Sequence, residues 1–185
     1  MGMNEMTVPG LTIVPCRPAD AEALSAIAKR TFYDTFTGTC SEEDMQGFLY
    51  EYYDAARLRR ELETGVLPSW FAMADGLPAG YVSFAQRPPA FPYNGDAAKA
   101  FELIRLYVDK PFHGKGVAQA LMRFYMDAAV AEGAACLWLG VWEHNYRAQK
   151  FYSKYGFTFT GHTHPFPIGL TPQIDQWWAK KVVSH

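Results

Sequence analysis

The segment Val108-Asp109-Lys110-Pro111-Phe112-His113-Gly114-Lys115-Gly116-Val117-Ala118 contains the pattern that decides the fold. The apolar stretch 101–108 before it is typical of a strand, and the alanine-rich stretch 115–132 is typical of a helix that ends at Gly133. A strand therefore ends, a short turn follows, and a helix begins at a pair of glycines. Because the first N–H groups of a helix are unpaired and its dipole favours negative charge, this segment predicts a diphosphate-binding turn.

The two glycines of the turn, Gly114 and Gly116, lack Cβ atoms and so allow a bulky anion to approach the backbone. A glycine-rich turn that binds nothing explains this segment equally well. The chain has neither a Walker A loop nor the G-x-G-x-x-G pattern of dinucleotide-binding proteins. The turn therefore needs a second motif before it can indicate a function.

A second motif follows between Asn145 and Phe157. Together, the two motifs resemble those of the GNAT N-acetyltransferase superfamily. The cofactor motif of that superfamily, [RQ]-x-x-G-x-[GA], aligns with residues 113–118, where His113 replaces the usual Arg or Gln. The later motif, roughly N-x-x-A-x-x-F-Y-x-x-x-G-F, is matched by Asn145, Ala148, Phe151, Tyr152, Gly156 and Phe157. The resemblance covers most of the chain.

The order of the other elements fits the same fold. We expect strands at 11–14, 70–74, 80–85, 101–108, 136–142, 157–161 and 176–183, and helices from Asp20, from Ser41 to about Gly65, at 115–132 and at 147–155. This order predicts an α/β fold: a mixed central β-sheet of about six to seven strands flanked by helices on both faces, as in GNAT-like acyl-CoA N-acyltransferases. We expect a single domain, 9–185, after an N-terminal tail, 1–8.

Composition limits the class of partner and the compartment. A net charge of -2 and a pI of about 6.2 argue against nucleic acid as a partner. No apolar run approaches the roughly 18 residues that a membrane span needs, and the N-terminus lacks the apolar region of a secretory signal. Three widely spaced cysteines favour free thiols and a cytoplasmic location. His162 and His164 have no ligating neighbours in sequence, so we interpret them as surface residues and expect no metal.

The resemblance implies that acetyl-CoA is the co-substrate and that its acetyl group passes to a primary amine by direct attack in a ternary complex. The pantetheine arm of acetyl-CoA would pair with the end of the strand 101–108, as an added strand does. The cofactor-binding residues that this implies are Leu106, Tyr107, Val108, His113, Gly114, Lys115, Gly116, Val117, Ala118, Asn145, Ala148 and Tyr152. Asn145 is equally expected to cap the helix that follows it.

The resemblance also implies two catalytic residues. Tyr152 matches the acid that protonates the leaving thiolate; the alternative is a packed tyrosine with a bonded hydroxyl. Glu102 is the candidate base, because strand alternation places it with Ile104, Leu106 and Val108 on one apolar face, where its pKa would be raised. A salt-bridged glutamate at the sheet edge is a nearly equal alternative for Glu102.

The acceptor is less well defined by sequence. The segment 31–65 carries eight acids against three bases, and the resemblance implies that it flanks the acceptor groove, so an acidic wall would favour a polyamine or another small cationic amine. A peptide amine is the next expectation. A non-catalytic acyl-CoA-binding sensor or interaction module on the same fold is the alternative function. Members of the superfamily often dimerise, which leaves a homodimer open.

Overall fold

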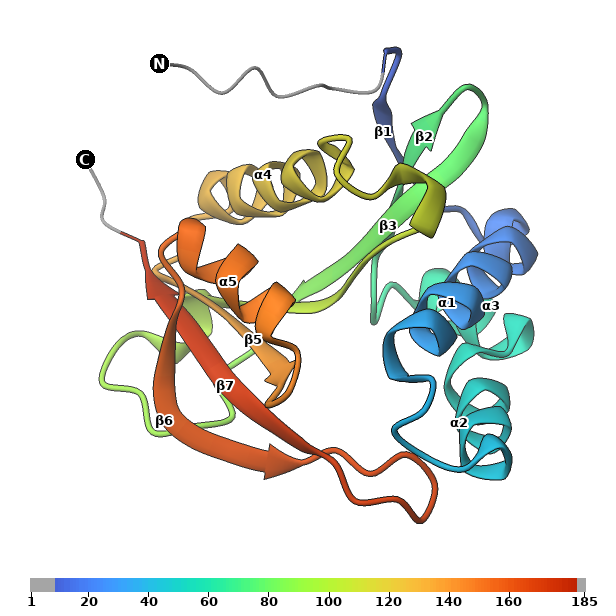
Figure 1. The fold of residues 1–185 in the computed structure, drawn as a ribbon. Helices are drawn as coiled ribbons and strands as arrows, with labels where there is room; N and C mark the ends of the chain where they lie inside the picture. Colours follow the sequence, from blue (N-terminus) through green and yellow to red (C-terminus); the bar gives the residue numbers. More distant parts are fainter. Residues whose placement is uncertain (1–8, 183–185) are drawn as a thin grey trace.

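The computed structural model describes residues 9–182 and contains one seven-stranded mixed sheet with the order β1-β2-β3-β4-β5-β7-β6 (Figure 1). The strands are β1 (Thr12–Pro15), β2 (Ser69–Ala74), β3 (Leu77–Gln86), β4 (Ala100–Val108), β5 (Cys136–Trp142), β6 (Thr158–Pro165) and β7 (Ile174–Lys181). The helices are α1 (Ala21–Phe36), α2 (Glu42–Tyr53), α3 (Ala55–Thr64), α4 (Val117–Ala131) and α5 (Tyr146–Lys154). The predicted α/β architecture is confirmed.

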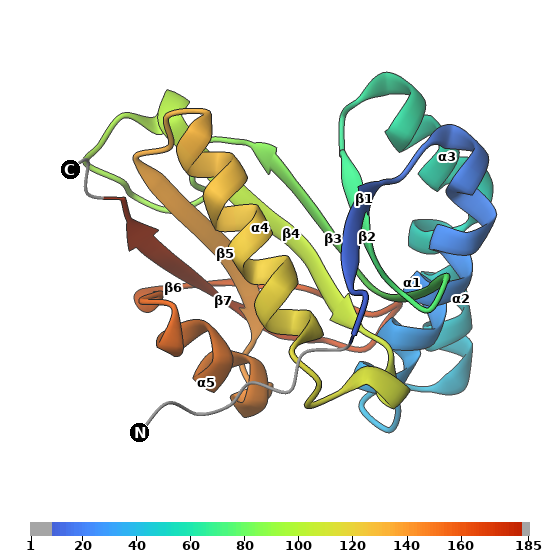
Figure 2. The same cartoon turned by 90° about the horizontal axis from the view of Figure 1, so that it is seen from above.

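Helices cover both faces of the sheet. Figure 2 shows α4 lying across one face, with α5 on the same side, while α1, α2 and α3 gather at the other. Each face has its own buried apolar cluster: α4 packs on strands β2 to β5, and the first three helices pack around Phe32, Phe71 and Tyr81. All adjacent strands are antiparallel except β4 and β5.

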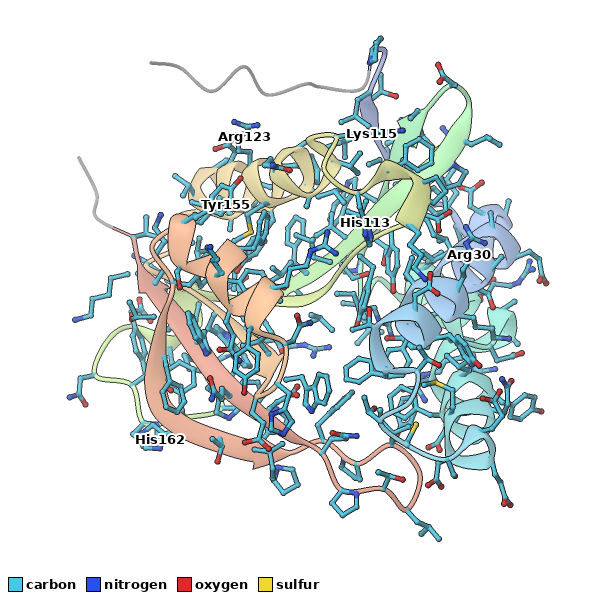
Figure 3. All side chains as sticks on the ribbon, viewed as in Figure 1. Arg30, His113, Lys115, Arg123, Tyr155 and His162 are labelled. Atoms are coloured by element: carbon cyan, nitrogen blue, oxygen red, sulfur yellow. The ribbon has the colours of Figure 1, made fainter. Side chains whose placement is uncertain are left out.

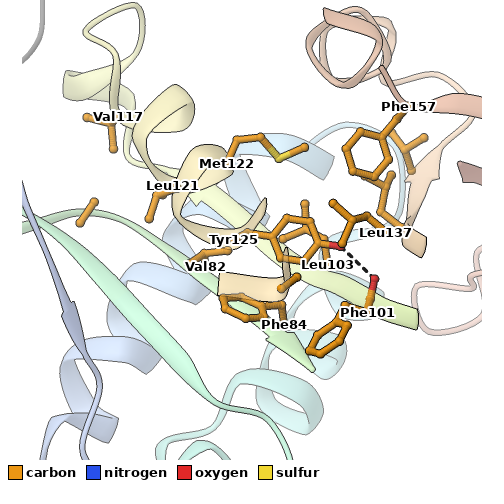
Figure 4. Close-up of a cluster of buried hydrophobic side chains, with 14 of the residues drawn as sticks. Val82, Phe84, Phe101, Leu103, Val117, Leu121, Met122, Tyr125, Leu137 and Phe157 are labelled. Atoms are coloured by element: carbon orange, nitrogen blue, oxygen red, sulfur yellow. Dashed lines mark hydrogen bonds between the residues drawn. The ribbon is translucent and has the colours of Figure 1, made fainter. Parts of the chain in front are cut away.

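The core under α4 fixes that helix against the centre of the sheet. Leu121, Met122 and Tyr125 are fully buried there, at helical spacing along one side of α4. The hydroxyl of Tyr125 donates a hydrogen bond of 2.9 Å to the carbonyl of Phe101 on β4 (Figure 4). The beginning of α4 is therefore held at a set position relative to the end of β4.

The chain forms two helices, α2 and α3, where the sequence predicted one continuous helix from Ser41 to about Gly65. Asp54 interrupts it, with an extended backbone (φ -64°, ψ 141°) and a side chain that accepts a hydrogen bond from the N–H of Ala56. Asp54 thus ends α2 and caps α3, as aspartate does at helix starts. The break turns α3 so that Leu58 is buried against the same cluster as α2.

Candidate active site

The central feature of the site is the divergence of the two parallel strands. β4 and β5 pair only from Ala100 opposite Cys136 to Leu103 opposite Leu139. Beyond Leu103 the edge of β4 that faces β5 has no strand partner. The N–H of Asp109 donates to the carbonyl of Ala79 on β3. Alternation therefore directs the N–H and carbonyl of Val108 to the other side, into the gap between β4 and β5. An extended ligand can pair with this free edge.

A β-bulge lies where the strands separate. Ser83 pairs with Arg105 and the next residue, Phe84, pairs with Leu103, so Ile104 is the extra residue in β4. The bulge reverses the alternation. Phe101 and Leu103 face α4, and after the bulge Leu106 and Val108 face it again, while Arg105 and Tyr107 face α1 to α3.

The prediction that Glu102 shares a face with Leu106 and Val108 is therefore wrong, because regular alternation does not continue through the bulge. The Glu102 carboxylate forms an ion pair with Arg87 at 3.0 Å, and Glu102 is not among the residues that line the cavity described below. Burial raises the pKa of Glu102, and Arg87 acts in the opposite direction. This is the salt-bridged arrangement that the sequence left as the alternative.

The predicted glycine turn lies at the end of the gap. Gly114 and Gly116 both have positive φ, at 75° and 81°, which disfavours any residue with a Cβ. A Cβ at Gly114 would meet nothing within 4 Å, so the backbone is open there. Gly116 caps α4 with no side-chain hydrogen bond, which leaves the first N–H groups of the helix for a ligand. The turn fits a diphosphate.

His113, which stands where the resemblance leads us to expect Arg or Gln, lies in the turn before α4 (Figure 3). Its Nε2 lies 2.8 Å from the carbonyl oxygen of Val108, and its Nδ1 lies 3.3 Å from Nη1 of Arg147 on α5. Because a carbonyl only accepts and a guanidinium only donates, the hydrogen of the neutral ring is on Nε2. His113 thus links the end of β4 to α5, and Arg147 with Lys115 adds positive charge beside the turn.

One cavity of about 860 Å³ joins the glycine turn to both faces of the sheet. Its walls come from α1, α2, the end of β4, the turn before α4, β5, α5 and β7. Ten of the twelve predicted cofactor-binding residues line it: Leu106, Tyr107, Val108, His113, Gly114, Val117, Ala118, Asn145, Ala148 and Tyr152.

 The other two, Lys115 and Gly116, belong to the same turn but do not line the cavity, and the Lys115 ammonium lies over the ring of Phe112.

Helix α5 brings Asn145 and Tyr152 to the cavity from the α4 side. The Asn145 side chain accepts a hydrogen bond of 3.0 Å from the N–H of Ala148 and so caps α5, which was one of the two roles predicted for it. Its amide nitrogen remains as a donor at the cavity wall. Burial raises the pKa of the Tyr152 hydroxyl, and the charge of Asp175 raises it further, so this hydroxyl keeps its proton at neutral pH.

Sequence reasoning missed Asp175, which lines the cavity, and His164, which lies beside Asp175. Asp175 on β7 lines the cavity, yet the predicted strand began one residue after it. His164 on β6 was interpreted as a surface residue, which is wrong: it stacks on Trp177 at 3.8 Å, and its Nε2 is buried. Of the two, His162 is exposed, at the outer edge of the sheet (Figure 3). The sequence did contain a signal for Asp175, because an acidic residue close to Trp177 and Trp178 at the start of a predicted strand is unusual unless it has a function.

The opposite side of the cavity is aromatic. Phe36, Phe48, Tyr52, Tyr53 and Phe166 line it next to Trp142. The predicted acidic wall is wrong in its extent, because Asp34 is the one acid of segment 31–65 among the lining residues.

Other acids of that segment hold the structure together instead. Asp44 accepts hydrogen bonds from Leu170 and Thr171, and Glu61 forms an ion pair of 2.8 Å with Arg105. These contacts explain why a count of charges along the segment did not predict the character of the wall.

The site, with its splayed parallel strands and glycine turn, is that of an acyl-CoA-dependent transferase fold. A model of the acetyltransferase (GNAT) family matches residues 25–157, and the chain belongs to this family. An uncharacterised N-acetyltransferase from the pepI 3' region of Lactobacillus delbrueckii subsp. lactis is 34% identical, over 94% of this chain and 99% of its own length. A second, from Mycobacterium tuberculosis, is 33% identical over 89% of this chain and 99% of its own length.

The fold is also similar to that of solved structures. PaiA N-acetyltransferase from Thermoplasma acidophilum, solved in complex with coenzyme A, has a TM-score of 0.74 at 21% identity, and the match covers 94% of this chain and 99% of that one. Within residues 9–182, no three His, Cys, Asp or Glu side chains gather as a metal site. No helix in the same range is long and apolar enough to cross a membrane.

Proposed function

We propose that this chain transfers an acetyl group from acetyl-CoA to the primary amine of a small cationic acceptor, by direct attack in a ternary complex. The observation that carries the proposal is the continuous cavity, which runs from the glycine turn along the free edge of β4 to an aromatic wall. Its two ends differ in chemistry: one offers N–H groups for a diphosphate, and the other offers ring faces. A ternary complex needs both substrates in one space, and this cavity has room for them.

The chain's own residues would hold the co-substrate in two ways. The N–H groups of Gly114, Gly116, Val117 and Ala118 would bind the diphosphate at the start of α4. The edge of β4 near Val108 would pair with the amides of the pantetheine arm, as an added strand does. His113 would have to release the carbonyl of Val108 wherever the arm uses that acceptor.

Two groups would then serve the chemistry. The N–H of Val108, directed into the gap, would donate to the thioester oxygen, and this bond strengthens as that oxygen gains negative charge. The Tyr152 hydroxyl would protonate the sulfur as the carbon–sulfur bond breaks. Its raised pKa keeps the proton available across the working pH range.

The aromatic wall supports a small cationic amine as acceptor. Ring faces attract ammonium groups, by about 0.5–2 kcal/mol each depending on how far the site is desolvated. Asp34 adds one carboxylate at the α1 side of the cavity. A polyamine remains the leading acceptor, followed by other alkylamines and by peptide amino groups.

Thiol release from acetyl-CoA tests the proposal. The protein is mixed with acetyl-CoA and a panel of polyamines, simple alkylamines, amino acids and peptides, and free thiol is measured against a blank without amine. In parallel, a thermal-shift series compares coenzyme A with ATP, since a ligand at 100 times its Kd stabilises by about 2.7 kcal/mol. Binding of coenzyme A without thiol release from any amine would refute the transferase proposal and favour a non-catalytic sensor.

A further inference from the structure

Unpartnered buried polar atoms gather beside the cavity, next to its lining residues Trp142 and Asp175. Among the described residues, four buried side-chain atoms have no hydrogen-bond partner: Tyr81 Oη, Trp142 Nε1, His164 Nε2 and Asp175 Oδ1. The last three come from one row across the sheet, because Trp142 on β5 pairs with Asp175 on β7, and Asp175 pairs with His164 on β6. Buried polar atoms are nearly always bonded, so three in a row indicate a ligand position.

Two acceptor groups of this row face each other, the His164 ring and the Asp175 carboxylate. Nδ1 of His164 lies 3.0 Å from the carbonyl oxygen of Pro165, so it carries the hydrogen, and Nε2 of the neutral ring presents a lone pair. That Nε2 lies 3.8 Å from Oδ2 of Asp175. An imidazole lone pair beside a carboxylate leaves room for donors only. An ammonium group, with three N–H donors, is the complementary ligand.

The row also lies where the two substrates would meet. Trp142 packs against Phe36 of α1 at 5.3 Å, so the row faces the aromatic side of the cavity. Burial raises the pKa of Tyr152 on α5 and of Tyr107 on β4, and the charge of Asp175 raises both further, so the carboxyl lies near the gap between the strands. Asp175 thus lies between Tyr152, the predicted acid, and the aromatic side of the cavity.

Gly140 makes this position accessible. A Cβ on Gly140 would lie 2.9 Å from the ring of Trp177, 3.3 Å from Oδ2 of Asp175 and 3.5 Å from Nε2 of His164. Any side chain there would therefore fill the space in front of the two acceptors. Gly140 itself lines the cavity, on the part of β5 that has separated from β4.

We propose that Asp175 is the catalytic base that accepts a proton from the acceptor amine; this inference rests on the proposed transferase function. The ammonium group gives one proton to the Asp175 carboxylate, which frees the nitrogen lone pair. Nitrogen bonds to the acetyl carbon, the carbon–sulfur bond breaks, and Tyr152 protonates the sulfur. The second nitrogen proton restores Tyr152, and Asp175 releases its own proton to water before the next turnover.

The surroundings of Asp175 suit a base that works near neutral pH. Burial raises its pKa from 3.8 to about 7. The titratable groups that face it are His164 from β6, Tyr152 from α5 and Tyr107 from β4, and within residues 9–182 no lysine or arginine forms an ion pair with it. Burial also lowers the pKa of His164, so that ring stays neutral and supplies no compensating charge.

The test compares Asp175→Asn with Glu102→Gln, the matched removal of a buried acid that lies outside the cavity. Each protein is assayed at saturating acetyl-CoA with the alkylamine found active in the panel, and with the analogue of that amine carrying fluorines on the neighbouring carbon. The fluorines lower the pKa of the amine, so it is already neutral at pH 7 and needs no base. Acetyl-CoA affinity and the pH profile of kcat are measured for each variant.

We expect Asp175→Asn to lower kcat for the alkylamine about 100-fold or more, with less than about a 5-fold loss for the fluorinated analogue. Acetyl-CoA affinity should change by less than about twofold, and the rise of kcat through neutral pH should disappear. Equal losses for both amines, loss of acetyl-CoA binding, a rate within threefold of wild type, or the same selective loss in Glu102→Gln would each overturn the assignment. A wild-type protein that acetylates no amine instead refutes the transferase function on which the assignment rests.

Discussion

Replacing Asp175 with Asn should make the protein more stable, and increasingly so as the pH rises. Burial raises the pKa of Asp175 from 3.8 to about 7, so the folded state binds this proton more tightly than the unfolded state does. The stability that this proton provides is complete below pH 4 and is lost as the pH rises through 7. Asn cannot ionise, so the variant escapes that loss.

The size of the effect follows from the two pKa values. One pKa unit corresponds to about 1.36 kcal/mol, so relative to a side chain that cannot ionise, Asp175 costs the folded state about 4 kcal/mol at pH 8 but only about 1.5 kcal/mol at pH 5. The free energy of unfolding of Asp175→Asn relative to wild type should therefore rise by about 2.5 kcal/mol between these two pH values. For a chain of this length, that is a relative gain in Tm of roughly 5–10 °C.

Urea unfolding of both proteins at pH 5, 6.5 and 8, without substrates, measures this difference directly. Asp127→Asn, the same substitution at an exposed position of α4, is the control for a general change in net charge. If the difference between Asp175→Asn and wild type is constant across the pH range, the carboxyl is not a buried group that titrates near neutral pH. That result would remove the physical basis for its role as a base.

Three further predictions concern other parts of the site. Tyr152→Phe should lower kcat by about 100-fold while acetyl-CoA affinity stays within twofold, and an unchanged kcat in the thiol assay would remove this hydroxyl from the mechanism. Gly114→Ala, at a φ of 75°, should cost about 1–2 kcal/mol in urea unfolding and raise the KM for acetyl-CoA about tenfold; an unaltered KM would contradict the diphosphate site. Glu61→Gln should destabilise the protein by about 3–5 kcal/mol, because Arg105 is left as a buried charge, and a loss below 1 kcal/mol would show that solvent reaches Arg105.

Local signals in the sequence were sufficient for the glycine turn and for α5. A strand, a turn with two glycines and an alanine-rich helix each depend on neighbouring residues, so Gly114, Gly116 and Tyr152 could be placed from the chain alone. The error at Asp54 has the opposite character. Helical spacing of apolar residues on both sides of Asp54 predicts one continuous helix. Only the packing of α3 against the buried cluster around Phe32 and Tyr81 makes the break favourable.

The choice of a candidate base shows the same contrast between local sequence signals and tertiary structure. Glu102 was chosen from alternation along β4, which holds only while the strand is regular, and the bulge at Ile104 is a property of its pairing with β3. Asp175 and His164 are 11 residues apart in sequence numbering but adjacent across β6 and β7, so no local pattern connects them.

The sequence by itself determined most of the order of the elements, the family resemblance, the glycine turn and the position of Tyr152, because each depends on residues close together along the chain. The tertiary structure alone decided where β4 and β5 separate, which acids reach the cavity and which are paired elsewhere. The physical reason is that burial and pairing depend on neighbours supplied by distant strands. A carboxyl such as Asp175 acquires its chemistry from Trp142 and His164 on the two adjacent strands, and that environment exists only once the sheet has formed.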